Sequence, residues 1–219
     1  MGYLSPLPVP LFVALGVALF LTPACRRLAL RFGVVDRPGG KKIHGQVTPL
    51  LGGVAIALAL AAGMAASGTA DQASLRILVA SGFILLLGIW DDLDPHAEAL
   101  RWWLRLLYEG CLAGIVVAGG VHIHFLGTPW LDVPVTLLWI VGITNAFNLL
   151  DNMNGLSAGV AAIAAVTFSL LAARYVEIGP EQLPTATAAA ALAGACLGFL
   201  PANFRSRIFM GDAGSLFLG

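Results

Sequence analysis

Two neighbouring carboxylates, Asp91 and Asp92, follow an apolar stretch of the chain. Adjacent acids repel one another, and an acid at the centre of a bilayer costs about 2.5–3.5 kcal/mol. A nearby cation would relieve both problems, so the pair is a candidate for a metal or phosphate site. The alternative is a pair of interfacial charges neutralised by Arg101 and Arg105. Arg105 and Glu109 are four residues apart and are expected to pair on one helix face.

A second polar set occurs at helical spacing. Asn145, Asn148 and Asp151 follow one another at steps of three residues, so on a helix they share an arc of about 120°. Asn154 joins them only if the helix ends near Asp151, which Gly155 favours. These side chains either bind a ligand or bind neighbouring helices.

A third candidate, Asp212, lies in Gly211-Asp212-Ala213-Gly214 at the predicted start of a helix. A carboxylate between glycines can ligate a metal, and a helix N-terminus favours phosphate. The same pattern is also typical of a helix N-cap.

Lys42 and His44 belong to a loop whose Pro and Gly residues predict turns. Its basic side chains could hold phosphate as point charges. The alternative is that the loop only anchors the chain at the cytoplasmic surface.

The elements that position these residues are predicted to be membrane helices, because 58% of the 219 residues are hydrophobic and only 11% are charged. A helix needs about 20 apolar residues to cross a bilayer. The sequence therefore predicts an all-α, polytopic transmembrane helix bundle of about seven spans, with an eighth starting near Ser215. The predicted spans are 4–25, 50–70, 73–90, 102–121, 133–150, 155–173 and 182–204. The span over 73–90 is the shortest between charges.

Basic residues predict the orientation of the spans, since Lys and Arg concentrate in cytoplasmic loops. With the N-terminus outside, ten of the twelve fall on the cytoplasmic side: Arg26, Arg27, Arg31, Arg37, Lys41, Lys42, Arg101, Arg105, Arg205 and Arg207. All four candidate loops then lie on that side, which favours one common site.

Other function classes fit less well. The net charge is zero, so no global field indicates a nucleic-acid partner. Cys25, Cys111 and Cys196 have neither disulfide nor metal spacing. A secondary transporter is the alternative from another class, but it needs polar groups near mid-membrane and repeat symmetry. Here the acids are predicted at one surface, and no repeat is visible.

From about Val35 to Gly219, the four motifs in this order resemble bacterial polyprenyl-phosphate N-acetylhexosamine-1-phosphate transferases, the undecaprenyl-phosphate GlcNAc-1-phosphate transferase type of glycosyltransferase family 4. The loop from Asp36 to His44 and on to Gly52-Gly53 is more similar to the common-antigen and teichoic-acid branch than to the MurNAc-pentapeptide branch. The resemblance implies a reaction dependent on Mg²⁺, or on Mn²⁺, in which a lipid phosphate attacks the β-phosphate of a UDP-sugar and UMP leaves.

The resemblance also implies roles for individual residues. Asp91, Asp92 and Asp151 match catalytic positions, and one of the first two would deprotonate the lipid phosphate. Asp212 matches the magnesium ligand. The substrate-binding positions are Lys42, His44, Arg105, Asn145, Asn148 and Asn154.

Three departures from the family pattern are visible. Asn152 stands where the family commonly has Gly, and Asn154 where it commonly has Asp, so the motif that contains Asn148 and Asp151 lacks one acid. Arg105 replaces the usual Lys, which keeps the charge but widens the head group. A later loop with a His-containing motif is absent, and His122-Ile123-His124 falls in a loop predicted to face outward.

The implied setting is a multi-pass protein of the bacterial inner membrane, with its active site facing the cytoplasm. Its partners would be a UDP-sugar, undecaprenyl phosphate and the bilayer, and a homodimer stays open. UDP-GlcNAc is the expected donor, and a phospho-MurNAc-pentapeptide translocase-like activity is the alternative. We expect residues 1–219 to form a single transmembrane catalytic domain that is incomplete at its C-terminus and inactive alone.

Overall fold

The computed structural model describes residues 4–37, 47–93, 102–124, 126–176 and 178–219. Within these ranges the chain is all-α apart from one two-residue strand pair, with eight α-helices in total. The helices are α1 (Pro8–Phe32), α2 (Gly52–Ser67), α3 (Gln72–Leu93), α4 (Trp102–Ala118), α5 (Pro129–Leu150), α6 (Leu156–Tyr175), α7 (Leu183–Asn203) and α8 (Gly211–Leu218). A short 3₁₀ turn, η2 (Pro180–Gln182), leads into α7.

Each predicted span coincides with a helix, but the helices differ in length. Five helical segments in the described part are long and apolar enough to cross a membrane: α1, α3, α5, α6 and η2 with α7. The predicted span over 73–90, the shortest between charges, corresponds to α3, which is one of these five and has 22 residues. In contrast, α2 and α4 have only 16 and 17 residues, a rise of about 24–26 Å against a hydrocarbon core of about 30 Å. The chain is therefore a multi-pass membrane protein, and the count of seven spans stays a prediction.

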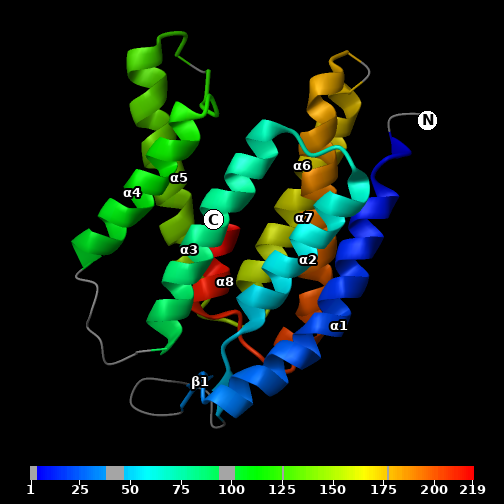
Figure 1. Ribbon diagram of the computed structural model, residues 1–219, viewed down its shortest axis with the longest axis vertical. Coiled ribbons are helices and arrows are strands. Elements are labelled where there is room, and N and C mark those ends of the chain that lie inside the picture. The colour runs from blue at the N-terminus through cyan, green and yellow to red at the C-terminus, as the bar shows by residue number, and fades with distance from the viewer. Residues whose placement is uncertain (1–3, 38–46, 94–101, 125, 177) are drawn as a thin grey trace.

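Four helices form the closely packed part of the molecule. α7 packs against α1, α2 and α6, and α1 also packs against α2. Figure 1 shows α4 and α5 standing apart from this group, with α3 and α8 between the two parts. Small residues permit the close packing, because added Cβ atoms at Gly194 and Gly198 would overlap the backbone carbonyls of Leu11 and Leu15 in α1. The small residues of α7 thus make it a close-packing helix.

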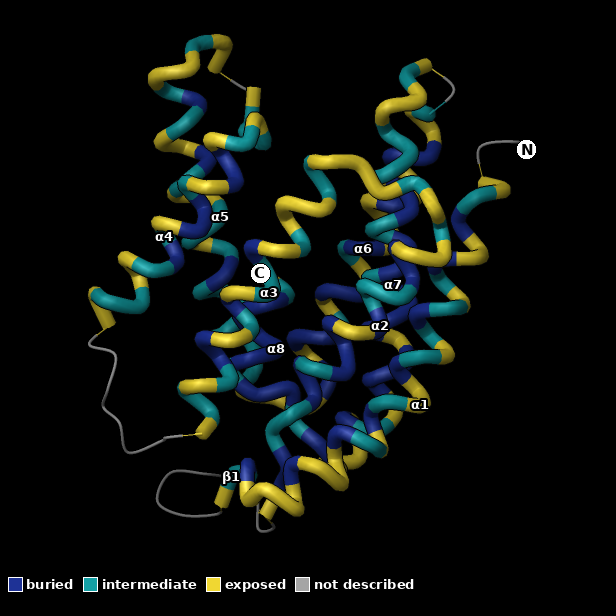
Figure 2. The backbone as a smooth tube through the Cα atoms, viewed as in Figure 1, coloured by how far each residue is buried: buried dark blue, intermediate teal, exposed yellow. Residues whose placement is uncertain are grey.

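The short helix α8 lies in the interior, with every residue from Ala213 to Phe217 buried (Figure 2). It packs against α2, α3 and α5. Added Cβ atoms at Gly53 of α2 and Gly88 of α3 would overlap the backbone of Gly214 and Ala213. Backbone therefore meets backbone on two sides of α8, and this contact fixes where Asp212 lies.

A two-stranded antiparallel pair joins the two ends of the loop that holds Lys42 and His44. β1 (Val35–Asp36) pairs with β2 (Thr48–Pro49), with Val35 opposite Pro49. Beyond β2, Phe209 N–H donates to Pro49 O at 2.8 Å, and Gly52 N–H donates to Phe209 O at 3.0 Å. The loop that holds Lys42 and His44 and the loop that leads to Asp212 are therefore hydrogen-bonded to each other through the backbone at their ends.

Gly88→Ala should destabilise the fold, because the new methyl group overlaps the Ala213 backbone and α8 must move. Overpacking typically costs about 1–3 kcal/mol. Thermal unfolding of the purified protein in detergent measures the loss. Gly82→Ala on the same helix is the matched control, since a Cβ at Gly82 meets nothing within 4 Å. Equal melting temperatures for both variants would contradict the backbone contact.

Candidate active site

The start of α8 is built on a glycine. Gly211 has φ +70°, in the left-handed region, and a Cβ there would overlap the Asp92 carboxylate and approach Leu50 O. Gly53 N–H donates to Met210 O at 3.0 Å, which ties this turn to α2. The turn therefore needs glycine both for its backbone angle and for its distance from Asp92.

Asp92 caps α8 from another helix. Its Oδ1 accepts the Asp212 N–H at 2.9 Å, and its Oδ2 accepts the Ala213 N–H at 3.2 Å. Both oxygens thus bind free N–H groups of the first turn, where an anion is stabilised by the helix dipole. The N-cap interpretation of Asp212 is wrong, because the capping carboxylate comes from α3 and Asp212 itself lies inside the first turn.

The Asp212 side chain takes no part in this cap and is 43% exposed. Asn148 Nδ2 donates to Asp212 Oδ1 at 2.8 Å, and to Ser215 Oγ at 2.9 Å. Asn148 therefore connects α5 to α8 and orients one Asp212 oxygen. The other oxygen, Oδ2, faces Arg105 Nη1 at 3.9 Å.

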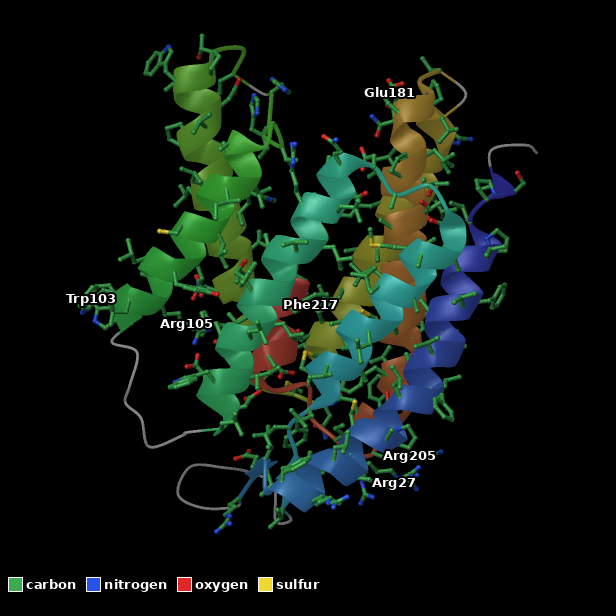
Figure 3. The ribbon with its side chains drawn as sticks, in the orientation of Figure 1. Arg27, Trp103, Arg105, Glu181, Arg205 and Phe217 are labelled. Carbon is green, nitrogen blue, oxygen red and sulfur yellow. The ribbon has the colours of Figure 1, made fainter. Side chains whose placement is uncertain are left out.

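Arg105 lies between two acids that come from different helices. Its Nη1 is 3.9 Å from Asp91 Oδ2 on α3 and 3.9 Å from Asp212 Oδ2 on α8. Figure 3 shows Arg105 on α4, on the side toward α3 and α8. Both distances exceed hydrogen-bond length, so the guanidinium balances the two carboxylates without closing on either one.

Asp151 directly follows the last residue of α5. Burial, and secondarily the negative charge of Asp212, raise the pKa of the Asp151 carboxyl to about 7. The helix ends here, as the sequence predicted. Asp151 therefore changes charge near neutral pH, beside the other acids.

The structure thus brings together Asp91, Asp92, Arg105, Asn148, Asp151 and Asp212. Asn145 lies one turn deeper on α5 and donates to Glu109 and to Val141 O. Asn154 lies apart from this group, with its Nδ2 donating to Ser206 Oγ at 2.6 Å. Lys42 and His44 lie outside the described residues.

Two contributors were missed as site residues. Ser215 accepts a hydrogen bond from Asn148, and it is the last residue of the Gly-Asp-Ala-Gly-Ser pattern that begins at Gly211. Glu109 is only 1% exposed and binds both Arg105 and Asn145. The sequence did indicate a role for Glu109, because a carboxylate in an apolar helix one turn from an arginine is rarely without a role.

No group of three or more His, Cys, Asp or Glu side chains spaced to hold a metal occurs in the part of the chain that the structure describes. Asp91 and Asp212 nevertheless offer oxygen donors on either side of one guanidinium. Mg²⁺ is commonly held by one or two carboxylates together with substrate phosphates. The donor set therefore fits a magnesium ion shared with a phosphate ligand.

Comparison with known proteins gives this site a context. The sequence pattern of Glycosyl transferase family 4 matches residues 74–219, which include all of α3 to α8 except two residues of α3. The chain belongs to this family.

Three relatives show how the family likeness extends along the chain. It is 36% identical to the probable undecaprenyl-phosphate N-acetylglucosaminyl 1-phosphate transferase of Bacillus subtilis (strain 168), over 96% of this chain and 60% of that protein. It is 32% identical to the decaprenyl-phosphate N-acetylglucosaminephosphotransferase of Mycolicibacterium smegmatis, over 93% and 55%. It is 36% identical to the phospho-N-acetylmuramoyl-pentapeptide-transferase of Heliobacterium modesticaldum, over 94% and 68%. The chain thus spans 55–68% of the lengths of these family 4 relatives.

Asp92→Asn should lower stability more than Asp91→Asn does. The amide keeps only one acceptor for two N–H donors and loses the charge, and hydrogen bonds to charged groups contribute about 1.5–3 kcal/mol. Asp91→Asn breaks no helix cap and relieves repulsion between neighbouring acids. Melting temperatures in detergent compare the two variants. A larger drop for Asp91→Asn would show that Asp92 does not cap α8.

Asp151→Asn should stabilise the metal-free protein at alkaline pH. Because the folded pKa lies above the ordinary value of 3.8, the wild-type carboxyl favours folding below that value and loses this advantage as pH rises toward 7. Asn stays neutral, so its relative gain grows between pH 4 and 7, to at most about 4 kcal/mol. Thermal unfolding with EDTA at pH 4.5 and pH 8 measures the gain. A gain that is equal at both pH values would contradict the raised pKa.

Proposed function

We propose that the whole protein transfers a sugar-1-phosphate from a UDP-sugar to a polyprenyl phosphate and releases UMP. The observation that carries this proposal is the group of Asp91, Arg105 and Asp212, in which acids and a cation from three helices meet beside the N-terminus of α8. Phosphoryl transfer needs mainly positioning and charge stabilisation. The names of the family 4 relatives support the same reaction class.

Asp91, rather than Asp92, is the proton acceptor in this proposal. Both Asp92 oxygens already accept hydrogen bonds from the α8 backbone, so protonating that carboxyl would weaken the helix cap. Asp91 is 20% exposed, and its Oδ2 lies 3.9 Å from Arg105 Nη1. Asp91 accepts the proton from the lipid phosphate, whose oxygen forms a bond to the β-phosphorus. The bond from that phosphorus to the bridging oxygen breaks, and UMP leaves with the electron pair.

Asp212 and one oxygen of Asp91 would hold the magnesium ion, which when bound would neutralise charge on the diphosphate, and the other Asp91 oxygen would stay open to the proton. Asn148 keeps Asp212 oriented through its 2.8 Å hydrogen bond. Arg105 supplies a permanent positive charge opposite the diphosphate. Family 4 enzymes are generally dependent on Mg²⁺, which agrees with this donor set.

The lipid chain would approach along α5. Closer to the N-terminus of α5 than its polar end, an apolar hollow is lined by Val135, Leu138, Trp139, Gly142 and Ile143. Leu138 is 75% exposed and Trp139 is 60% exposed. A polyprenyl chain against this face would bring its phosphate toward Asn148 and Asp151. The excess of Arg and Lys at the same end supports a cytoplasmic orientation of the site.

UDP-GlcNAc is the proposed donor, because two of the relatives carry N-acetylglucosamine in their names. UDP-MurNAc-pentapeptide is the second candidate, since the Heliobacterium relative is also 36% identical. An assay of membranes containing the whole protein with each donor separates the two. Faster product formation with UDP-MurNAc-pentapeptide would reverse the assignment.

Membranes containing the protein should release UMP from UDP-GlcNAc when undecaprenyl phosphate and Mg²⁺ are present. Asp91→Asn should lower the rate about 10²–10⁴-fold, the usual effect of losing a general base. Glu181→Gln is the matched control, because Glu181 is an exposed carboxylate at the opposite end of the helices (Figure 3). Release of UDP in place of UMP would contradict the reaction type, and full activity of Asp91→Asn would contradict the role of Asp91.

A further inference from the structure

Glu109 is a charged side chain that the proposed chemistry does not use. It lies on α4, it is 1% exposed, and it is among the largest fully buried side chains in the described residues. A carboxylate in an apolar helix persists only with close partners. Its contacts should therefore reveal what it does.

Both Glu109 oxygens have a partner. Oε1 accepts the Arg105 Nε–H at 3.2 Å, one turn earlier on α4. Oε2 accepts a hydrogen bond from Asn145 Nδ2 on α5. Glu109 is thus held in place by a neighbouring helix and binds the inner side of the guanidinium.

The outer side of the same guanidinium faces the candidate metal ligands. Arg105 Nη1 lies 3.9 Å from both Asp91 Oδ2 and Asp212 Oδ2, and Nη2 is buried without a hydrogen-bond partner among the described residues. An arginine free to move would close on one of these carboxylates as a two-bond pair, which is its strongest geometry. The bond from Nε to Glu109 opposes that movement.

We infer that Glu109 is a positioning residue that holds Arg105 back from Asp91 and Asp212, so that their oxygens stay open to a divalent cation. This inference rests on the proposed function, because it assigns the two aspartates to a metal site. Asn145 then acts one step further away, by fixing the Glu109 carboxylate.

Glu109→Gln should weaken divalent-cation binding. The neutral amide attracts the guanidinium less strongly, Arg105 moves onto the aspartates, and the cation must displace it. Mn²⁺, measured by electron paramagnetic resonance on the whole protein in detergent without substrates, is the probe. We expect the Mn²⁺ dissociation constant to rise about tenfold, the effect of losing one hydrogen bond between charged groups.

The arginine itself provides the decisive comparison. In an Arg105→Gln background, Glu109→Gln should leave Mn²⁺ binding unchanged within about twofold, because nothing remains to be held back. Equal weakening in both backgrounds would mean that Glu109 acts through its own charge, and would overturn the inference. No weakening in either background would overturn it as well.

Tyr108→Phe is the matched structural control. It removes the Tyr108 hydrogen bond to Phe83 O at 3.1 Å, which links α4 to α3, without touching Arg105. It should lower the melting temperature and leave Mn²⁺ affinity unchanged. Weakening of Mn²⁺ binding by Tyr108→Phe as strong as by Glu109→Gln would reduce Glu109 to a packing role.

The metal measurement also separates this inference from the proposed reaction. A protein that binds Mn²⁺ and shows the arginine-dependent effect, but releases no UMP, would overturn the reaction alone. Absence of Mn²⁺ binding in the parent protein would overturn both proposals.

Discussion

The capping of α8 by Asp92 is the interaction on which the rest of the site depends. One carboxylate from α3 binds the N–H groups of the second and third residues of a helix that begins 119 residues later in the chain. Because α8 also meets α2 and α3 through backbone at Gly53 and Gly88, it has little freedom to slide or turn. The position of Asp212 is therefore a consequence of helix packing, and a change to that packing would also displace the Asp212 carboxylate.

The adjacent acids Asp91 and Asp92 have different partners and therefore different roles in this arrangement. Asp92 is engaged by backbone N–H groups, whereas Asp91 faces a guanidinium at a distance greater than a hydrogen bond. Asp212 has one oxygen held by Asn148 and the other facing Arg105. Several acids gathered around one arginine carry excess negative charge, which a divalent cation would relieve. Glu109 differs from these acids because it binds the Arg105 Nε–H, whereas Asp91 and Asp212 face Nη1.

The sequence predicted the helical architecture and the convergence of most site residues, because apolar lengths and polar positions at helix ends carry that information. It predicted that the helix would end near Asp151, and it grouped Asn148, Asp151 and Asp212. It could not distinguish Asp91 from Asp92, since that depends on how α3 is rotated toward α8. Local pattern also left open that Asp212 is its own helix cap, because a cap supplied from another helix leaves no local signal.

Other differences have similar physical origins. The lengths of α2 and α4 depend on where tertiary packing ends each helix, so the helices are a few residues shorter than the predicted spans 50–70 and 102–121. The hydrogen bond from Asn145 to Glu109 joins residues 36 positions apart, and it depends on the register between α4 and α5. Asn154 was expected to join the other polar residues if the helix ended near Asp151, but the turn that follows Asp151 directs its side chain to Ser206. Lys42 and His44, which lie outside the described residues, remain predictions.

We propose that Asp91 and Asp212 form the cation and phosphate site while Asp92 holds α8 in place. An experimental structure of the whole protein with Mn²⁺ and UDP-GlcNAc, using the anomalous signal of manganese to locate the ion, tests it most directly. We expect an ion at about 2.0–2.3 Å from an Asp212 oxygen, near Asp91, with both Asp92 oxygens still bound to the N–H groups of Asp212 and Ala213. An ion ligated by Asp92, with the start of α8 released from it, would show that these roles are wrongly assigned.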